Sequence, residues 1–185
     1  MMVATGALTI LFGTQETRDF WVDGLKLWWL QVRGGLEKVR RLVISLDNGP
    51  NNSGSRTQFL KRRIDFADGT GLEIRLVYDP PYHSKYNPIE RCWSALEQKW
   101  GGALRNRLKI IWQEALRMKW CGRYPTVKRL CGVDPDGVRI TKKEMKPYEA
   151  RLERAATLPK YDILIRPKGC NRSPDSPIAP RSLVT

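Results

Sequence analysis

Short apolar runs alternate along this chain with longer segments whose apolar residues recur at helical spacing. Three runs have the length of β-strands and lie at Ala7–Phe12, Leu42–Leu46 and Leu72–Tyr78. Four amphipathic segments lie between and after them, at Glu16–Arg33, Ser55–Ala67, Asn87–Trp100 and Leu108–Trp120. Strands that alternate with helices of this length favour an α/β fold, in which helices pack on a sheet. The order of the runs therefore predicts the fold class.

The two later strands end abruptly in polar turn signals. Leu42–Leu46 is almost entirely apolar, so we expect it to be covered on both faces. Leu72–Tyr78 alternates apolar and polar residues, so one of its faces should be more exposed. The first strand is followed by Asp47-Asn48-Gly49-Pro50 and the second by Asp79-Pro80-Pro81. Because open α/β sheets place binding sites at the carboxyl ends of their strands, residues just after these strands are candidates for chemistry.

The clearest helix start lies at Asn87. This residue is a good N-cap, and Glu90 follows it at the spacing of a capping box. A further helix is predicted from Thr141, where a second capping box occurs, to about Ala156. Residues 167–185 contain four prolines and no periodicity, so they are predicted to form a flexible tail.

The net charge is strongly positive and unevenly distributed. The chain has 33 Lys and Arg against 19 Asp and Glu, which gives a formal net charge of +14. Residues 1–47 hold six basic and five acidic groups, a net +1, which leaves +13 for residues 48–185. A basic chain of this kind indicates a polyanionic partner, above all nucleic acid, with general solubility charge as the alternative.

Cysteine spacing and the first residues of the chain argue against several other classes. The four cysteines include no pair with the two-residue gap of a zinc knuckle, and a single histidine cannot complete a Cys/His zinc site. Met1–Gly13 lacks the features of a signal peptide, and no apolar run approaches the ~20 residues of a membrane helix. We therefore expect reduced thiols in a cytosolic protein.

Asp47 and Glu90 are the two acidic residues best placed for chemistry. Asp47 comes directly after a strand, and Glu90 lies in the first turn of the helix that follows the next strand. If those strands are neighbours, the helix can bring Glu90 toward Asp47, and carboxylates that meet at a sheet edge bind Mg²⁺ or Mn²⁺. A metal pair there can stabilise an in-line phosphoryl displacement. The alternatives are that Asp47 only starts a turn and that Glu90 only completes the cap at Asn87.

The loop ahead of that helix offers candidate contacts to nucleic acid. His83 could contact a phosphate or orient a metal-bound water, with a structural hydrogen bond as the alternative. Lys85 is a candidate phosphate contact, and Tyr82 and Tyr86 could stack on bases or pack over the sheet edge. Arg91, in the first turn of the helix, is a further candidate for the DNA backbone.

Two motif blocks make the sequence similar to a known family. The blocks are Leu46–Ser53 (LDNGPNNS) and Pro80–Trp93 (PPYHSKYNPIERCW). Together they resemble bacterial insertion-sequence transposases of the DDE type, and the Asn-Pro-Ile-Glu part looks like the third-carboxylate motif of the Tc1/mariner-like group. The resemblance extends over roughly residues 7–165 and includes Lys142–Glu153.

The resemblance implies a ribonuclease-H-like catalytic core that cleaves DNA strands and transfers them with two metal ions. Asp47 matches the second Asp of the family triad, and Glu90 matches its Glu. The implied cofactor is Mg²⁺ or Mn²⁺, and the implied partners are transposon-end DNA, target DNA and further copies of the chain. On this basis we expect a cytoplasmic, nucleoid-associated protein. The expected divisions are a partial catalytic core over residues 1–120, a carboxyl-terminal helical extension over 121–166 and the tail over 167–185.

The sequence departs from the family at the first catalytic Asp. In the family that residue lies on the first strand of the fold, upstream of the strand that Ala7–Phe12 resembles. Asp19 and Asp23 lie on a predicted helix, so neither replaces it. We therefore expect the carboxyl-terminal portion of a transposase, truncated before its first strand or strands, with an unpaired sheet edge. The alternatives are a catalytically inactive DNA-binding remnant and a different nuclease on the same fold.

Overall fold

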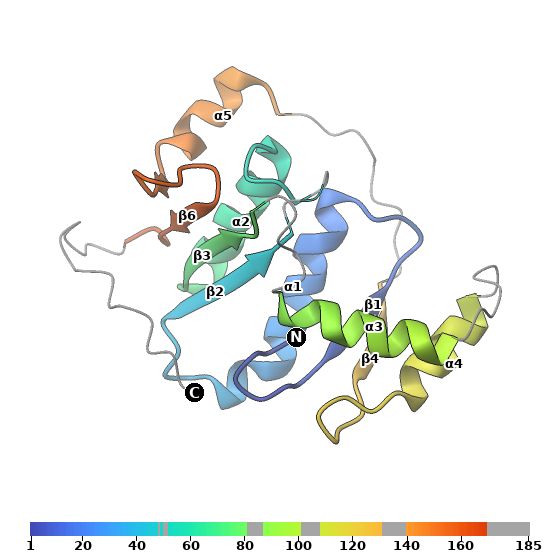
Figure 1. The fold of residues 1–185 in the computed structure, drawn as a ribbon. Helices are drawn as coiled ribbons and strands as arrows, with labels where there is room; N and C mark the ends of the chain where they lie inside the picture. Colours follow the sequence, from blue (N-terminus) through green and yellow to red (C-terminus); the bar gives the residue numbers. More distant parts are fainter. Residues whose placement is uncertain (48, 50–51, 81–86, 101–107, 131–139, 170–185) are drawn as a thin grey trace.

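The structure is a computed structural model, and it describes residues 1–169 apart from 48, 50–51, 81–86, 101–107 and 131–139 (Figure 1). Its elements in chain order are β1 (Thr9–Phe12), α1 (Arg18–Val32), the short 3₁₀ helix η1 (Arg33–Gly35), β2 (Arg41–Leu46), α2 (Thr57–Thr70), β3 (Glu73–Tyr78), α3 (Pro88–Trp100), α4 (Leu108–Arg117), β4 (Thr126–Arg129), α5 (Lys142–Glu149), β5 (Leu152–Arg154) and β6 (Asp162–Ile165).

A four-stranded mixed sheet with the strand order β2-β3-β6-β5 forms the centre of the fold. β2 and β3 run parallel, with Leu46 opposite Tyr78, and α2 is the crossover between them. β6 pairs antiparallel with β3, and β5 pairs antiparallel with β6. The arrangement confirms the predicted α/β class.

The main core lies where α2 packs on this sheet. Phe59 and Ile64 of α2 are fully buried, as are Ile74 of β3, Ile163 of β6 and Val22 of α1, and all five belong to one apolar cluster. Burial of each such side chain contributes about 1.5–3 kcal/mol of transfer free energy. α2 therefore packs against both the sheet and α1, which fixes the connection from β2 to β3.

β2 lies at the edge of the sheet and has one face open to solvent, which corrects the expectation that both of its faces are covered. Leu42 and Ile44 pack against the main core, whereas Val43 on the opposite face is 57% exposed. The apolar run misled the prediction because an apolar residue in a strand does not by itself reveal whether anything covers its face.

A second, smaller group of elements surrounds the parallel pair β1 and β4 (Figure 1). Its core joins Leu8 and Ile10 at β1 with Cys92 and Leu96 of α3 and with Met118, which follows α4. α3 therefore belongs by its packing to this group, while the loop before it starts at β3 of the main sheet. The chain around α3 connects the two groups of elements.

The carboxyl-terminal part of the described chain differs from the prediction. The helix starts with the expected capping box at Thr141 but ends at Glu149 rather than near Ala156. β5 and β6 follow it, and Leu152 pairs with Ile165. Sheet pairing has overridden the helical pattern there, because the partner strand is supplied by residues 9 to 13 positions further along the chain.

The expected helical extension over residues 121–166 is therefore not purely helical. It contributes β4 to the smaller sheet and β5 and β6 to the main sheet. The divisions at residues 120 and 166 stay predictions, and most of the predicted tail lies outside the described residues. None of the helices in the described ranges is both long and apolar enough to cross a membrane.

Candidate functional site

The carboxyl ends of β2 and β3 place two acidic residues side by side. Leu46 and Tyr78 are paired at the ends of the two parallel strands, and the next residues are Asp47 and Asp79. The backbone N–H of Asp79 donates to the carbonyl oxygen of Leu46 at 2.8 Å, so the pairing continues to this point. Asp79 was not among the predicted site residues. Its signal in the sequence is the same as that of Asp47, an acidic residue directly after a strand.

A tight turn holds the carboxylate of Asp47. Its Oδ1 atom accepts hydrogen bonds from the side-chain Nδ2 of Asn52 at 2.7 Å and from the backbone N–H of Gly49 at 3.2 Å. Asp47 itself is exposed, while Asn52 is only 2% exposed. Asp47 therefore does start a turn, and the turn leaves its carboxylate accessible at the sheet edge, so its role as a metal ligand stays a prediction.

Tyr78 anchors that turn to the sheet. The buried hydroxyl of Tyr78 donates to the backbone carbonyl of Asn52 at 2.9 Å. Burial raises the pKa of Tyr78, so the hydroxyl stays protonated and remains a donor. The last residue of β3 thus supports the residue that orients Asp47.

Asn87 connects the start of α3 to the same edge. Its Nδ2 donates to Oδ2 of Asp79 at 2.9 Å, and its Oδ1 accepts from the backbone N–H of Ile89 at 3.3 Å. The backbone N–H of Glu90 donates to the carbonyl of Asn87 at 3.0 Å. The predicted cap is therefore present, and it fastens the first turn of α3, which carries the half-buried Glu90, to the residue beside Asp47.

The oxygen atoms at this edge suit a hard divalent cation in their chemistry. Asp47 offers a carboxylate, and the buried Oδ1 of Asn52 has no hydrogen-bond partner within the described part of the chain. No group of three or more His, Cys, Asp or Glu side chains that could hold a metal occurs among the described residues. The donor types fit Mg²⁺ or Mn²⁺, with Asp47 and Glu90 as the residues that would hold it.

Most of the predicted DNA contacts cannot be placed. Tyr82, His83, Lys85 and Tyr86 lie outside the described residues, so their roles stay predictions. Arg91 is exposed on α3 directly after Glu90, and its predicted contact with the DNA backbone is likewise untested.

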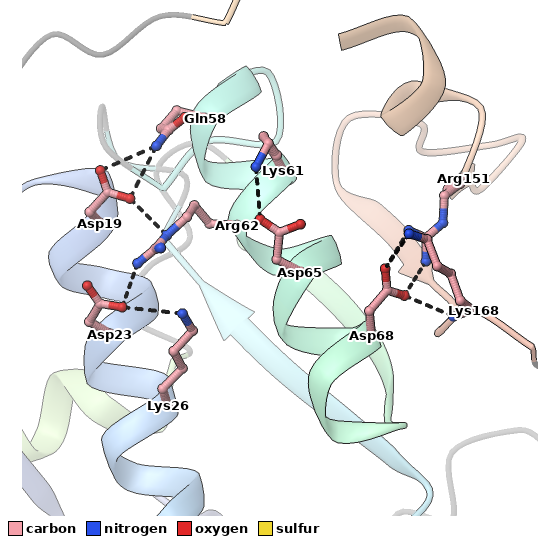
Figure 2. Close-up of polar contacts among 10 residues, drawn as sticks. All are labelled: Asp19, Asp23, Lys26, Gln58, Lys61, Arg62, Asp65, Asp68, Arg151 and Lys168. Atoms are coloured by element: carbon pink, nitrogen blue, oxygen red, sulfur yellow. Dashed lines mark hydrogen bonds and ion pairs between the residues drawn. The ribbon is translucent and has the colours of Figure 1, made fainter. Parts of the chain in front are cut away.

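Ion pairs tie the other carboxylates near α2 to arginine and lysine side chains (Figure 2). Arg62 of α2 binds Asp19 through Nε at 2.9 Å and Asp23 through Nη2 at 2.5 Å. Asp68, near the end of α2, accepts hydrogen bonds from both terminal nitrogens of Arg151, at 2.8 and 2.6 Å. Asp19 and Asp23 therefore join α1 to α2.

The comparisons with known proteins agree with the family that the two motif blocks indicate. The family model of the Rhodopirellula transposase DDE domain matches residues 2–167. Searches of curated proteins and of solved structures find no match. The family model covers most of the chain, which confirms the resemblance to insertion-sequence transposases. The chain therefore belongs to the Rhodopirellula transposase DDE domain family of DDE transposases.

Proposed function

We propose that this chain supports metal-dependent cleavage of DNA strands and their transfer to target DNA, with Asp47 and Glu90 as catalytic residues. The observation that carries the proposal is the chain of contacts at the sheet edge. Asp79 bonds to Leu46, the residue before Asp47, and also to Asn87, which caps the helix that carries Glu90. Two separate segments are thereby fastened to one place, as a site built from both would require.

The chemistry would proceed at the ends of β2 and β3. Mg²⁺ or Mn²⁺, when bound, supplies Lewis-acid stabilisation of the charge that develops on phosphate oxygens. Asp47 and Glu90 would hold the cation, and Asn87 would keep the first turn of α3 in place. Water would attack the phosphorus and displace the 3′ oxygen. The 3′ hydroxyl so exposed would attack a phosphorus of the target strand and displace its 3′ oxygen.

The basic character of the chain supports DNA as the partner. Residues 48–185 carry a net charge of +13, and the proposed site lies at the start of that region. A surface of this sign attracts phosphate backbones and releases bound cations from DNA, so binding should weaken with salt. Assembly into a homo-oligomer on transposon ends remains part of the proposal.

A nicking assay tests the catalytic proposal. The purified chain is incubated with Mg²⁺ or Mn²⁺ and a supercoiled plasmid that carries the DNA flanking its gene. We expect nicking that is lost in Asp47→Asn and in Glu90→Gln. Glu97→Gln is the matched control, because Glu97 is exposed on the same helix two turns further on. Nicking that persists in Asp47→Asn would refute the assignment.

A non-catalytic DNA-binding protein is the second candidate. It needs only the excess of positive charge and no catalytic site. It predicts salt-sensitive DNA binding without nicking by the wild-type chain. A fluorescence titration measures binding to a duplex with the sequence of the plasmid insert at several salt concentrations. Together with the nicking assay, it separates this candidate from the first. Affinity that does not change with salt would contradict both.

A further inference from the structure

We propose that the side-chain oxygen of Asn52 is a ligand of the cation at this site and that Gly49 leaves the space for it. The inference rests on the proposed function, because it adds a residue to the Asp47 site. Asn52 lies outside the set of acidic residues that the sequence suggested, and it is a buried polar side chain that is hydrogen-bonded to Asp47.

The nitrogen and the oxygen of the Asn52 side-chain amide differ in whether they have a hydrogen-bond partner. Nδ2 donates to Oδ1 of Asp47 at 2.7 Å, which sets the orientation of the amide. Oδ1 is buried and has no hydrogen-bond partner in the described ranges. A buried oxygen without a partner is costly, and in folded proteins such an atom is commonly met by a water molecule or an ion.

Gly49 marks where that ligand would sit. A Cβ added to Gly49 would lie 3.4 Å from Oδ1 of Asn52, and 3.4 and 3.6 Å from Oδ1 and Oδ2 of Asp47. Three oxygen atoms therefore surround the space that the missing side chain leaves open. The φ angle of Gly49 is not in the left-handed range, so its backbone does not require glycine.

The surrounding structure fixes Asn52 for this role. Its backbone N–H donates to the carbonyl of Gly49 at 3.3 Å, and its own carbonyl accepts the bond from Tyr78. Both contacts use the backbone, so they hold the residue in place while the side chain remains available. A neutral amide oxygen beside a carboxylate is a common ligand pair for hard divalent cations.

Mn²⁺ binding to the whole chain tests the proposal without any need for DNA cleavage. The loss of the free Mn²⁺ electron-paramagnetic-resonance signal gives the affinity directly. We expect Asn52→Leu and Gly49→Ala to weaken Mn²⁺ binding at least about tenfold. Asn52→Asp, which restores an oxygen at the same place, should bind Mn²⁺ more tightly than Asn52→Leu.

Matched controls separate a ligand from a structural residue. Gly69→Ala makes the same chemical change where an added Cβ meets nothing within 4 Å, and it should bind Mn²⁺ as the wild type does. Tyr78→Phe removes the anchor of the turn but no ligand oxygen. It should lower the melting temperature while the Mn²⁺ affinity stays close to that of the wild type. If Asn52→Leu lowers only the melting temperature and keeps wild-type Mn²⁺ affinity, Asn52 is structural and the proposal is wrong.

Failure of this inference can be told from failure of the proposed function. If Asp47→Asn loses Mn²⁺ while Asn52→Leu and Gly49→Ala bind it normally, the Asp47 site stands and Asn52 is not a ligand. If Asp47→Asn binds Mn²⁺ as the wild type does, or if the wild-type chain shows no saturable binding, both the inference and the metal site at Asp47 are overturned.

Discussion

Arg63, on α2, has a charged guanidinium group that is buried in the protein. The residue is 2% exposed, and its Nε and Nη1 atoms have no hydrogen-bond partner among the described residues. The guanidinium carbon lies 4.6 Å from the centre of the Phe59 ring, a cation–π contact that offsets part of the lost hydration. Burial lowers the pKa of Arg63 to about 10, so the side chain stays charged at neutral pH. A charge buried in this way opposes folding.

We expect Arg63→Met to be as stable as the wild type, or more stable by up to about 2 kcal/mol at pH 7, because Met fills the volume without a charge to desolvate. Folding lowers the pKa of Arg63, so the penalty is fully present below pH 10 and is relieved as the pH rises through that value. The advantage of the variant should therefore shrink in alkali. Urea unfolding measures it, with the surface variant Lys61→Met as the control. A loss of more than about 3 kcal/mol would mean that the guanidinium has an essential partner.

Asp68 is the carboxylate whose charge contributes most clearly to stability. Hydrogen bonds from Arg151, together with the backbone N–H of Lys168, hold the pKa of Asp68 below its usual range. A carboxylate with a lowered pKa stabilises the fold above the unfolded-state pKa of about 3.9 and loses that contribution as the pH falls through the folded value. The ion pair fastens the end of α2 to the chain on either side of β5 and β6.

Asp68→Asn should cost about 2 kcal/mol at pH 7, because it leaves the guanidinium of a partly buried pair without its charged partner. The difference from the wild type should diminish as the pH falls below about 4, where the unfolded state takes up the proton, and through the lower folded-state pKa, where the folded state takes it up too. Thermal unfolding between pH 7 and acid pH measures both effects. Asp65→Asn removes the carboxylate of an exposed pair on the same helix and should change stability by less than about 0.5 kcal/mol. Equal losses in the two variants would contradict the interpretation.

At the scale of the elements, the junction between β3 and α3 decides whether the candidate site is assembled. Asn87 performs two tasks there, since its Oδ1 caps α3 and its Nδ2 bonds to Asp79. The first task stabilises the helix, and the second places the helix start beside the strand ends. Because one side chain performs both, a suitable substitution can separate them.

Asn87→Ser should retain the cap, because a hydroxyl can accept from the first free N–H groups, but it is too short to reach Asp79. We expect its stability to stay within about 0.5 kcal/mol of the wild type while nicking falls as far as in Asn87→Ala. Asn87→Ala should lose about 1 kcal/mol of stability in addition. Unfolding and nicking measured on the same preparations provide the comparison. Full nicking activity in Asn87→Ser would show that the bond to Asp79 does not position Glu90.

The elements that the sequence predicts best are those whose signals are local. The apolar run before Asp47 and the cap at Asn87 each give a strand end or a helix start at the expected residue. β5 and β6 escaped prediction because they have only three and four residues, and their pairing depends on β3, which is far away in the sequence. Short strands of this kind are fixed by their partners rather than by their own composition.

The same distinction separates the predicted and the missed parts of the site. Asp47 was predicted as a candidate because an acidic residue after a strand is a recognisable pattern. Asn52 and Asp79 were not found, because asparagine in a polar turn and aspartate before two prolines are ordinary turn formers. Their proximity to Asp47 follows from the parallel pairing of Leu46 with Tyr78 and from the fold of the turn. Neither relation is visible in the residues themselves.

At the scale of the whole molecule, the free edge of the main sheet is the most consequential exposed feature. No described strand pairs with the outer edge of β2, and Val43 on that strand is 57% exposed. Edge strands with apolar residues pair readily with other chains. The positive charge of the molecule opposes such association at low salt, because it keeps copies apart.

Self-association should therefore increase with salt, which screens the repulsion between copies and leaves the free edge of β2 available. Val43→Lys should reduce it, since a charge on an edge strand disfavours pairing between chains, and at an exposed position it should cost less than about 0.5 kcal/mol of stability. Light scattering across a range of protein and salt concentrations measures the effect. Val3→Lys is the matched control, because Val3 is 73% exposed and lies outside the main sheet. If Val3→Lys and Val43→Lys suppress association equally, added charge explains the effect; if only Val43→Lys does, the edge of β2 is the contact between copies.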